Sequence, residues 1–283
     1  MNQRTPQPER RWIRRAAVRL PLYYLVLVAL AYFLQNWLLY HPVRMSPQQV
    51  RENASAAGLR LWPDGEVDYR GLTSGSGLER GRPVVAVFHG NAGSASDRDH
   101  YVAALEPLGY SVLLLEYPGF GARPGKLSEP SFVADAVASL QAAIREAGAP
   151  LFLLGESLGA GVAASVAGTG EIPVAGVGLI TPWDTLPDLA QSLYWFLPAR
   201  LLVKDRYDSV QNLRRYRGPV AVLMAEWDEI IPRRHTVALY ESLPEPKRLW
   251  VFPGATHNRW PNDPGAGWWQ EVMEFLSGGG ESR

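Results

Sequence analysis

A pentapeptide near the middle of the chain, Gly155-Glu156-Ser157-Leu158-Gly159, places the strongest constraint on the fold. An apolar run at 151–154 precedes it, and a stretch of small residues at 160–164 follows it. This pattern predicts a buried strand, a sharp turn at Ser157 and a helix. Flanking glycines permit a strained backbone and a close approach of the helix to the strand, so the serine hydroxyl is exposed above the sheet edge. Ser157 is therefore the candidate nucleophile.

A serine hydroxyl attacks a carbonyl efficiently only when a neighbouring base takes its proton, and His257 is the candidate base. It ends a glycine-containing loop that follows the last apolar run, 249–252. Such a loop allows an imidazole to reach over the sheet edge. The other histidines follow the N-terminal apolar segment, lie in polar helical stretches or precede the serine in the chain: His41, His100, His235 and His89.

The base needs a carboxylate to orient it, and Asp228 is the candidate acid. It lies in the turn after the apolar run 220–225. Glu226 and Glu229 share that loop and are weaker alternatives. Asp184, which follows the preceding apolar run, is the more serious alternative as the acid, although a surface cap or turn also fits its position.

Two backbone N–H groups must receive the negative charge that develops on the attacked carbonyl oxygen. The apolar run 84–88 leads into His89-Gly90-Asn91, where Gly90 lets the backbone bend toward the nucleophile. The expected oxyanion donors are the N–H groups of Asn91 and of Leu158, which opens the helix after the serine turn.

Together these pieces, in the chain order serine, acid, histidine, resemble the α/β-hydrolase superfamily. Within it the chain is similar to membrane-tethered alpha/beta-hydrolase-domain proteins related to the S33 serine peptidases. The resemblance covers residues from about 67 to the C-terminus and is carried by five segments: 89–93, 116–121, 155–159, the Asp228 turn and His257. Haloalkane dehalogenases have a similar His-Gly-Asn loop but use an aspartate where Ser157 stands, so dehalogenation is disfavoured.

The order of the remaining segments indicates one α/β domain with a doubly wound, mostly parallel sheet. Short and nearly uniform apolar runs are typical of strands buried on both faces of such a sheet. Helical stretches alternate with these runs. The expected strands are 84–88, 112–115, 151–154, 174–180, 220–225 and 249–252, and the expected helices are 94–108, 128–147, 157–167, 232–242 and 264–276.

The N-terminal region reads as a membrane anchor. Residues 1–19 carry six arginines, and residues 20–40 carry no charge and are long enough to cross about 30 Å of hydrocarbon as a helix. By the positive-inside rule, residues 1–19 form a cytoplasmic tail and the enzyme domain lies outside the cytoplasm. Two alternatives stay open: a signal sequence cleaved after Ala29-Leu30-Ala31, or a monotopic helix shortened by Gln35 and Asn36. We expect a linker at 41–66 and the hydrolase domain at 67–278.

The segment 181–218 is longer than a simple crossover between strands requires. It contains many large apolar residues at partly helical spacing, which fits either a helix packed on the sheet or a short lid over an acyl pocket. If it is a lid, Trp183, Tyr194 and Trp195 are the expected substrate-binding residues.

Composition narrows the function further. The formal net charge is zero, so no general field favours nucleic acid. Cysteine is absent and the histidines and carboxylates do not show metal-ligand spacing, so we expect neither a metal nor a cofactor. The expected activity is cleavage of carboxylic esters of small molecules or lipids through an acyl-serine. Amide cleavage, with Glu116, Glu156 or Glu226 binding a substrate amine, and a non-catalytic tethered binding protein are the alternatives.

Overall fold

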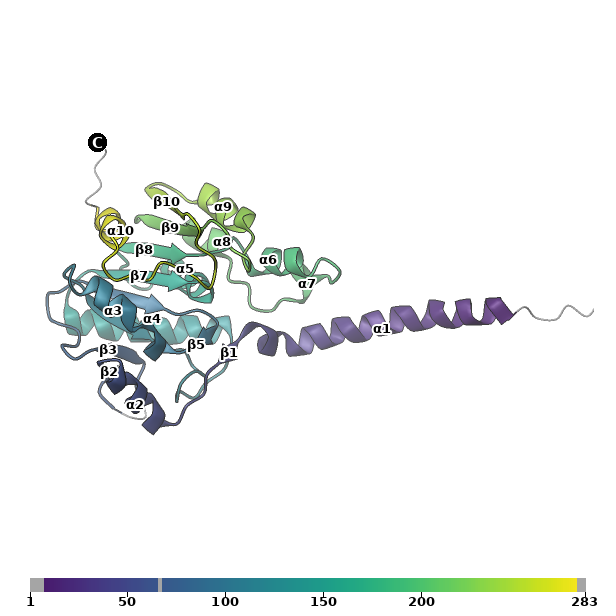
Figure 1. Cartoon of the computed structure of the whole chain (residues 1–283), viewed down its shortest axis with the longest axis horizontal. Coiled ribbons are helices and arrows are strands. Elements are labelled where there is room, and N and C mark those ends of the chain that lie inside the picture. The colour runs from purple at the N-terminus through teal and green to yellow at the C-terminus, as the bar shows by residue number, and fades with distance from the viewer. Residues whose placement is uncertain (1–7, 66–67, 279–283) are drawn as a thin grey trace, which may run out of the picture.

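The computed structural model describes residues 8–65 and 68–278 of the 283-residue chain. A long helix, α1 (Pro8–Leu39), projects from an α/β domain, and this domain contains the rest of the described chain (Figure 1). The expected basic tail at 1–19 lies partly outside the described residues. Among described residues, α1 is the one helix long and apolar enough to cross a membrane, and the candidate span within it is Arg19–Leu39.

The domain is built on an eight-stranded sheet with the order β10-β9-β8-β7-β4-β6-β3-β2. Six strands are parallel, and they match the six expected apolar runs closely: β4 (Val84–Phe88), β6 (Ser111–Leu115), β7 (Leu151–Glu156), β8 (Gly176–Ile180), β9 (Val220–Ala225) and β10 (Lys247–Phe252). All but β10 are buried along almost their whole length, which explains why their sequences are uniformly apolar. The predicted doubly wound α/β fold is confirmed.

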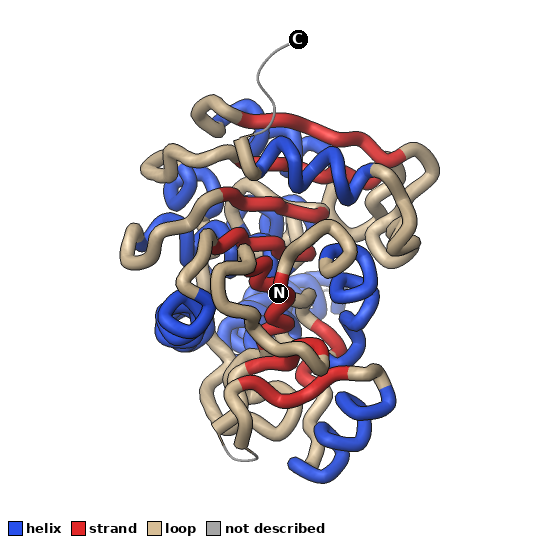
Figure 2. The backbone as a smooth tube through the Cα atoms, turned by 90° about the vertical axis from the view of Figure 1, so that its left-hand side faces the viewer, coloured by secondary structure: helices blue, strands red, loops and turns tan. Residues whose placement is uncertain are grey.

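Helices cover both faces of the sheet (Figure 2). One face carries α2 (Pro47–Ala56), α3 (Asp99–Leu105) with a preceding 3-10 turn at Ala95–Arg98, and α10 (Trp268–Leu276). The other carries α4 (Glu129–Ala147), α5 (Leu158–Thr169), α8 (Ser209–Leu213) and α9 (Arg233–Ser242). Helix α4 begins and ends as its sequence predicts: Ser128 accepts the amide of Ser131, and Gly148 ends the helix in the left-handed conformation.

The segment 41–66, expected as a linker, is folded instead. It contains α2 and β2 (Leu59–Trp62), and β2 pairs antiparallel with β3 (Gly71–Ser74), which in turn pairs antiparallel with β6. The two ends of β2, Leu59 and Trp62, are buried, whereas Arg60 between them is exposed and Leu61 is half-buried, so the strand is not a uniform apolar run. A second, two-stranded sheet joins β1 (His41–Pro42) to β5 (Ala92–Gly93), so the residues after α1 are tied to the loop that follows β4.

The segment 181–218 divides into two parts. Helix α8 packs beside α5, where the Asn212 side chain donates to Ser165 Oγ at 3.0 Å. Helices α6 (Leu186–Leu193) and α7 (Ala199–Leu202) lie instead on the side of the domain from which α1 departs (Figure 1). Helix α8 therefore follows the expectation of a helix packed on the core, whereas α6 and α7 have the position expected of a lid.

Candidate active site

The serine turn lies at the carboxyl end of β7, near the middle of the sheet. Ser157 has a φ of 52°, in the left-handed region that non-glycine residues seldom adopt. Both neighbouring glycines are sterically required: a Cβ on Gly155 would overlap the Gly159 carbonyl, and a Cβ on Gly159 would overlap the Phe88 carbonyl. The helix α5 therefore starts directly against β4 and β7, as the pentapeptide predicts.

The structure brings Ser157, His257 and Asp228 together. His257 Nε2 is 2.9 Å from Ser157 Oγ, and His257 Nδ1 is 2.9 Å from Asp228 Oδ2. With the proton on Nδ1, the ring donates to the carboxylate and leaves Nε2 free to accept the serine hydroxyl proton. Asp228 Oδ1 also accepts the amides of Ile230 and Ile231 at 2.9 and 2.7 Å, so the carboxylate is fixed in its loop.

The three alternatives to Asp228 as the catalytic acid bind other groups. Asp184 accepts from His235 Nδ1 at 2.8 Å, and His235 Nε2 is 2.9 Å from Ser192 Oγ, so this second histidine joins α9 to α6. Glu229 binds the His257 backbone: its Oε2 accepts the His257 amide at 2.9 Å. Its own backbone amide and that of His257 lower the pKa of the Glu229 carboxyl. Glu226 accepts the Gly254 amide, also at 2.9 Å.

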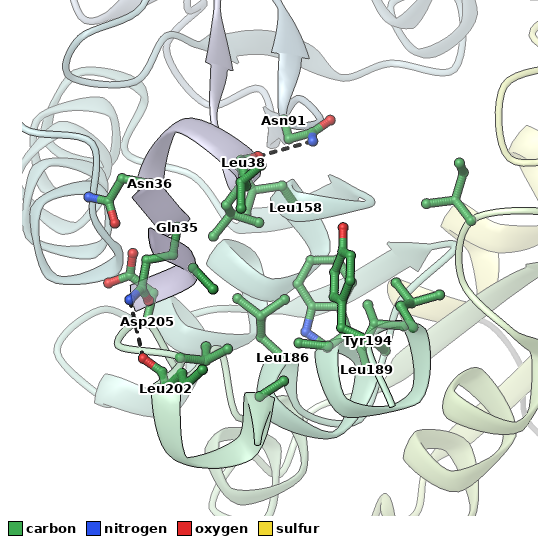
Figure 3. Close-up of a pocket in the computed structure, with 18 of the residues that line it drawn as sticks. Gln35, Asn36, Leu38, Asn91, Leu158, Leu186, Leu189, Tyr194, Leu202 and Asp205 are labelled. Carbon is green, nitrogen blue, oxygen red and sulfur yellow. Dashed lines mark hydrogen bonds between the residues drawn. The ribbon is translucent and has the colours of Figure 1, made fainter. Parts of the chain in front are cut away.

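The two expected oxyanion donors lie beside the serine. Leu158 is the first residue of α5, so its N–H has no carbonyl partner within the helix. Asn91 is held by two bonds that do not use its N–H: its carbonyl accepts the His41 amide at 2.9 Å, and its side chain donates to Leu39 O at 3.1 Å. Asn91, Leu158 and Ser157 line one cavity, and Figure 3 shows Asn91 and Leu158 in its wall.

Glu156, next to the serine, connects the loop after β4 with the serine turn. It accepts the Gly90 amide at 3.0 Å, Arg98 Nε at 2.6 Å and the Tyr101 hydroxyl at 2.9 Å. Burial alone would raise the pKa of this carboxyl, but the Arg98 charge and these hydrogen bonds outweigh burial and lower the pKa below its ordinary value. Glu156 is therefore a charged structural link. Sequence reasoning identified it as a neighbour of the nucleophile, but not its ion pair with Arg98.

The cavity in front of the serine has a volume of about 280 Å³ and a mostly apolar wall. Trp183 and Tyr194 line it, in agreement with their expected place. Trp195 does not: it follows the end of α6, where the helical spacing stops, and its side chain is 79% exposed. Its predicted place in the pocket is therefore wrong. Helices α6 and α7 and the loop after Asp228 also contribute to the wall.

Sequence reasoning missed one wall of this cavity entirely. The last turns of α1 contribute Ala31, Gln35, Asn36, Leu38 and Leu39 to it (Figure 3). The signal was present in the polar pair Gln35 and Asn36, which interrupt an otherwise apolar helix. A pair of amides in such a helix indicates either a shorter membrane span or a contact with the protein itself, and the structure gives the contact.

Comparisons with known proteins agree with this geometry. A family model described as serine aminopeptidase, S33 (Hydrolase_4), matches residues 79–203, which include the loop at Asn91 and the serine turn. Residues 79–203 match this family, and the domain has the α/β-hydrolase fold seen in solved lipase and esterase structures. The resemblance predicted from the sequence is confirmed, and the matched residues include the candidate nucleophile and both candidate oxyanion donors.

Two relatives and one solved structure illustrate the similarity of this α/β-hydrolase. An uncharacterized protein of Mycobacterium tuberculosis is 37% identical over 179 residues, which cover 62% of this chain and 63% of that protein. Lysophosphatidylserine lipase ABHD12 of Danio rerio is 31% identical over 193 residues, covering 61% and 50%. The crystal structure of Paleococcus ferrophilus monoacylglycerol lipase aligns with a TM-score of 0.52 and 25% identity, covering 71% of this chain and 97% of that one. The chain thus matches half to two thirds of the length of these curated relatives.

Proposed function

We propose that this α/β-hydrolase is a membrane-attached serine esterase that cleaves carboxylic esters with an apolar acyl chain. The observation that carries the proposal is the position of His257, within 2.9 Å of both the Ser157 hydroxyl and the Asp228 carboxylate, at one end of an apolar cavity. A serine, a histidine and a carboxylate in this arrangement are the components of nucleophilic acyl transfer.

In the proposed mechanism, Ser157 Oγ attacks the ester carbonyl carbon while His257 Nε2 takes the hydroxyl proton. The N–H groups of Asn91 and Leu158 stabilise the oxyanion. The tetrahedral adduct then collapses, the bond to the alcohol oxygen breaks, and His257 returns the proton to the leaving alcohol. Water attacks the acyl-serine with His257 again as base, which releases the carboxylic acid and restores the serine. Asp228 keeps the imidazole in the required tautomer throughout.

The cavity wall supports an acyl substrate rather than a charged one. Leucines, alanines and aromatic rings form most of it. Within the described part of the chain, Asp205 is the one carboxylate in the wall, and it already accepts the Tyr40 hydroxyl at 2.6 Å and the Glu129 amide at 3.1 Å. A hydrocarbon chain can fill such a space without leaving polar groups unpaired. Relatives named as lysophosphatidylserine lipase and monoacylglycerol lipase are consistent with this substrate class.

The amidase alternative requires a free carboxylate to bind a substrate amino group. The three candidates are occupied and lie outside the cavity wall: Glu156 is paired with Arg98, Glu226 accepts the Gly254 amide, and buried Glu116 accepts from His89 Nε2 at 3.0 Å and from the Ala95 amide at 3.2 Å. These contacts favour the ester over the peptide as substrate.

The helix α1 supports attachment to a membrane. Arg19–Leu39 has a mean hydropathy of 1.6 and is not buried by the rest of the protein. With the arginines of residues 1–19 on the cytoplasmic side, the enzyme domain would lie outside the cytoplasm.

The proposal is tested with the full-length chain in detergent micelles, because α1 forms part of the cavity. Turnover of 4-nitrophenyl acetate and 4-nitrophenyl laurate is measured for wild type and Ser157→Ala. We expect the variant to retain less than about a thousandth of wild-type turnover on both esters. Equal activity of the two proteins would refute the mechanism, and absence of a fluorophosphonate adduct on folded wild type would favour the non-catalytic binding protein.

A further inference from the structure

The end of α1 is fastened to the hydrolase domain by side chains rather than merely preceding it. Both halves of the Gln35 amide are used. Its Nε2 donates to Leu202 O at 3.2 Å (Figure 3), and its Oε1 accepts the Lys204 amide at 2.8 Å. Asn36 donates to Leu127 O at 2.8 Å. These bonds hold one face of the apolar helix against α7 and the loop before α4, and that face forms a cavity wall.

The segment from α6 to α7 lies beside α1 and becomes more apolar with distance from the domain. Near the domain, the Lys204 ammonium lies 4.2 Å from the centre of the Tyr32 ring. Further out, the Tyr24 hydroxyl donates to Phe196 O at 3.0 Å. Tyr24 and Tyr32 are separated by about 12 Å along the axis, at 1.5 Å per residue. Charge therefore lies at the base of this segment and aromatic rings lie at its tip.

The tip, residues 193–196, exposes four large apolar side chains that the domain does not cover. Trp195 is 79% exposed, and Leu201 on α7 is 85% exposed. This patch is continuous with the exposed apolar side chains of α1, because Tyr24 bonds to Phe196. Tyr24 and Tyr32 both lie within the candidate span Arg19–Leu39, so the segment beside them lies at the depth of the bilayer, with the lysine nearer the domain and the aromatic tip in the hydrocarbon.

We propose that α1 and the 193–196 tip together form a lipid-facing mouth of the cavity, and that the acyl chain of a bilayer-resident ester passes between them to reach Ser157. This inference rests on the proposed esterase function. It assigns α1 a second role beyond attachment: Ala31 and Leu38 contact the acyl chain, and Gln35 and Asn36 hold α1 at the spacing that the chain requires. The partner of the exposed tip is the lipid bilayer.

The first test fills the mouth without touching the serine. Ala31→Trp places a large ring in the cavity wall, whereas the matched control Ala29→Trp makes the same change on an exposed face of the same helix outside the wall. The readout is the ratio of turnover of 4-nitrophenyl laurate to that of 4-nitrophenyl acetate, for full-length protein in phosphatidylcholine vesicles. We expect Ala31→Trp to lower this ratio at least about tenfold and Ala29→Trp to leave it within about twofold of wild type.

Equal ratios for the two tryptophan variants would overturn the proposed mouth. If the two tryptophan variants have equal ratios but Ser157→Ala is inactive in the same assay, the proposed mouth is refuted and the esterase function is not. If Ser157→Ala is as active as wild type, the esterase function itself fails and the mouth fails with it.

The second test measures where the tip lies, without reference to activity. Because the chain has no cysteine, a nitroxide can be attached at one introduced site. Trp195→Cys is compared with Arg80→Cys. Arg80 is exposed and lies in the loop before β4, at the amino end of this strand and so at the opposite end from the serine turn. In vesicles we expect the label at 195 to be relaxed by oxygen and protected from a nickel chelate, and the label at 80 to show the reverse. Free access of the nickel chelate to 195, or protection that depends on protein concentration and so indicates a second copy, would overturn the proposal.

Discussion

Asp228 and His257 are joined by a 2.9 Å hydrogen bond from the ring Nδ1 to the carboxylate Oδ2, although Asp184 is an aspartate that also follows a central strand. Asp184 is bonded to a different histidine, His235, at 2.8 Å. The two aspartates therefore occupy equivalent local settings but only Asp228 contacts the ring that faces Ser157.

This pairing predicts opposite effects of two identical substitutions. Asp228→Asn removes the acceptor that fixes the His257 tautomer, so kcat for 4-nitrophenyl acetate should fall by about 10³ to 10⁴. Asp184→Asn should leave kcat within about fivefold, because its carboxylate accepts from His235 and the Thr185 amide and does not contact His257. Steady-state kinetics on both variants measures the difference, and a larger loss for Asp184→Asn would assign the acid to the other aspartate.

The close approach of α5 to β4 predicts a stability effect at Gly159. A methyl group there would overlap the carbonyl oxygens of Phe88 and His89, and backbone atoms at the sheet centre cannot move aside easily. Gly159→Ala should therefore lower the free energy of unfolding by about 2 kcal/mol or more. Gly75→Ala, where nothing lies within 4 Å of the added Cβ, is the control. Urea unfolding followed by circular dichroism compares them, and equal midpoints would contradict the packing described for the serine turn.

The lowered pKa of Glu156 predicts how stability depends on pH. A carboxyl whose pKa is lower in the folded state stabilises the fold above its unfolded pKa, which is about 4.5, and loses that contribution as the pH falls through the folded pKa. Glu156→Gln should thus be less stable than wild type at pH 7, and the difference should shrink as the pH falls below about 4.5. Thermal unfolding at several pH values checks this, and a difference independent of pH would exclude the ionised Glu156 as its source.

The six arginines of residues 1–19 predict the orientation of the chain. Arg80→Cys, the single cysteine in the variant, should react with a membrane-impermeant maleimide added to intact cells that express the protein. Labelling only after the cells are broken open would place the domain in the cytoplasm and reverse the assignment.

The sequence was sufficient to predict the parallel strands and the serine turn because each has a strong local cause. Buried strands such as 84–88 are uniformly apolar, and the turn at Ser157 requires glycines within two residues. The edge strand β2 was not predicted, because it has four residues, one of them the exposed Arg60, and no uniform apolar run. Short strands at a sheet edge carry little local signal.

The participation of α1 in the cavity was also not predicted. Gln35 and Leu202 are 167 residues apart, and no local periodicity connects residues at that separation. From the sequence, the two amides favour only the alternative of a shortened membrane span, since polar groups inside an apolar segment have the same appearance whether water, lipid headgroups or protein satisfies them. Trp195 was misplaced for a related reason: helical spacing was extended past Leu193, where α6 ends.

The central claim is that Ser157, activated by His257, forms the acyl-enzyme. The most direct measurement is mass spectrometry of full-length protein after brief exposure to 4-nitrophenyl laurate and acid quenching, with peptides mapped for the added acyl group. A lauroyl adduct on Ser157 in wild type, retained longer in Asp228→Asn because water also needs His257 as base, and absent from Ser157→Ala, is the predicted result. Hydrolysis of the ester by wild type and Ser157→Ala at equal rates, with no adduct at residue 157, would contradict the claim.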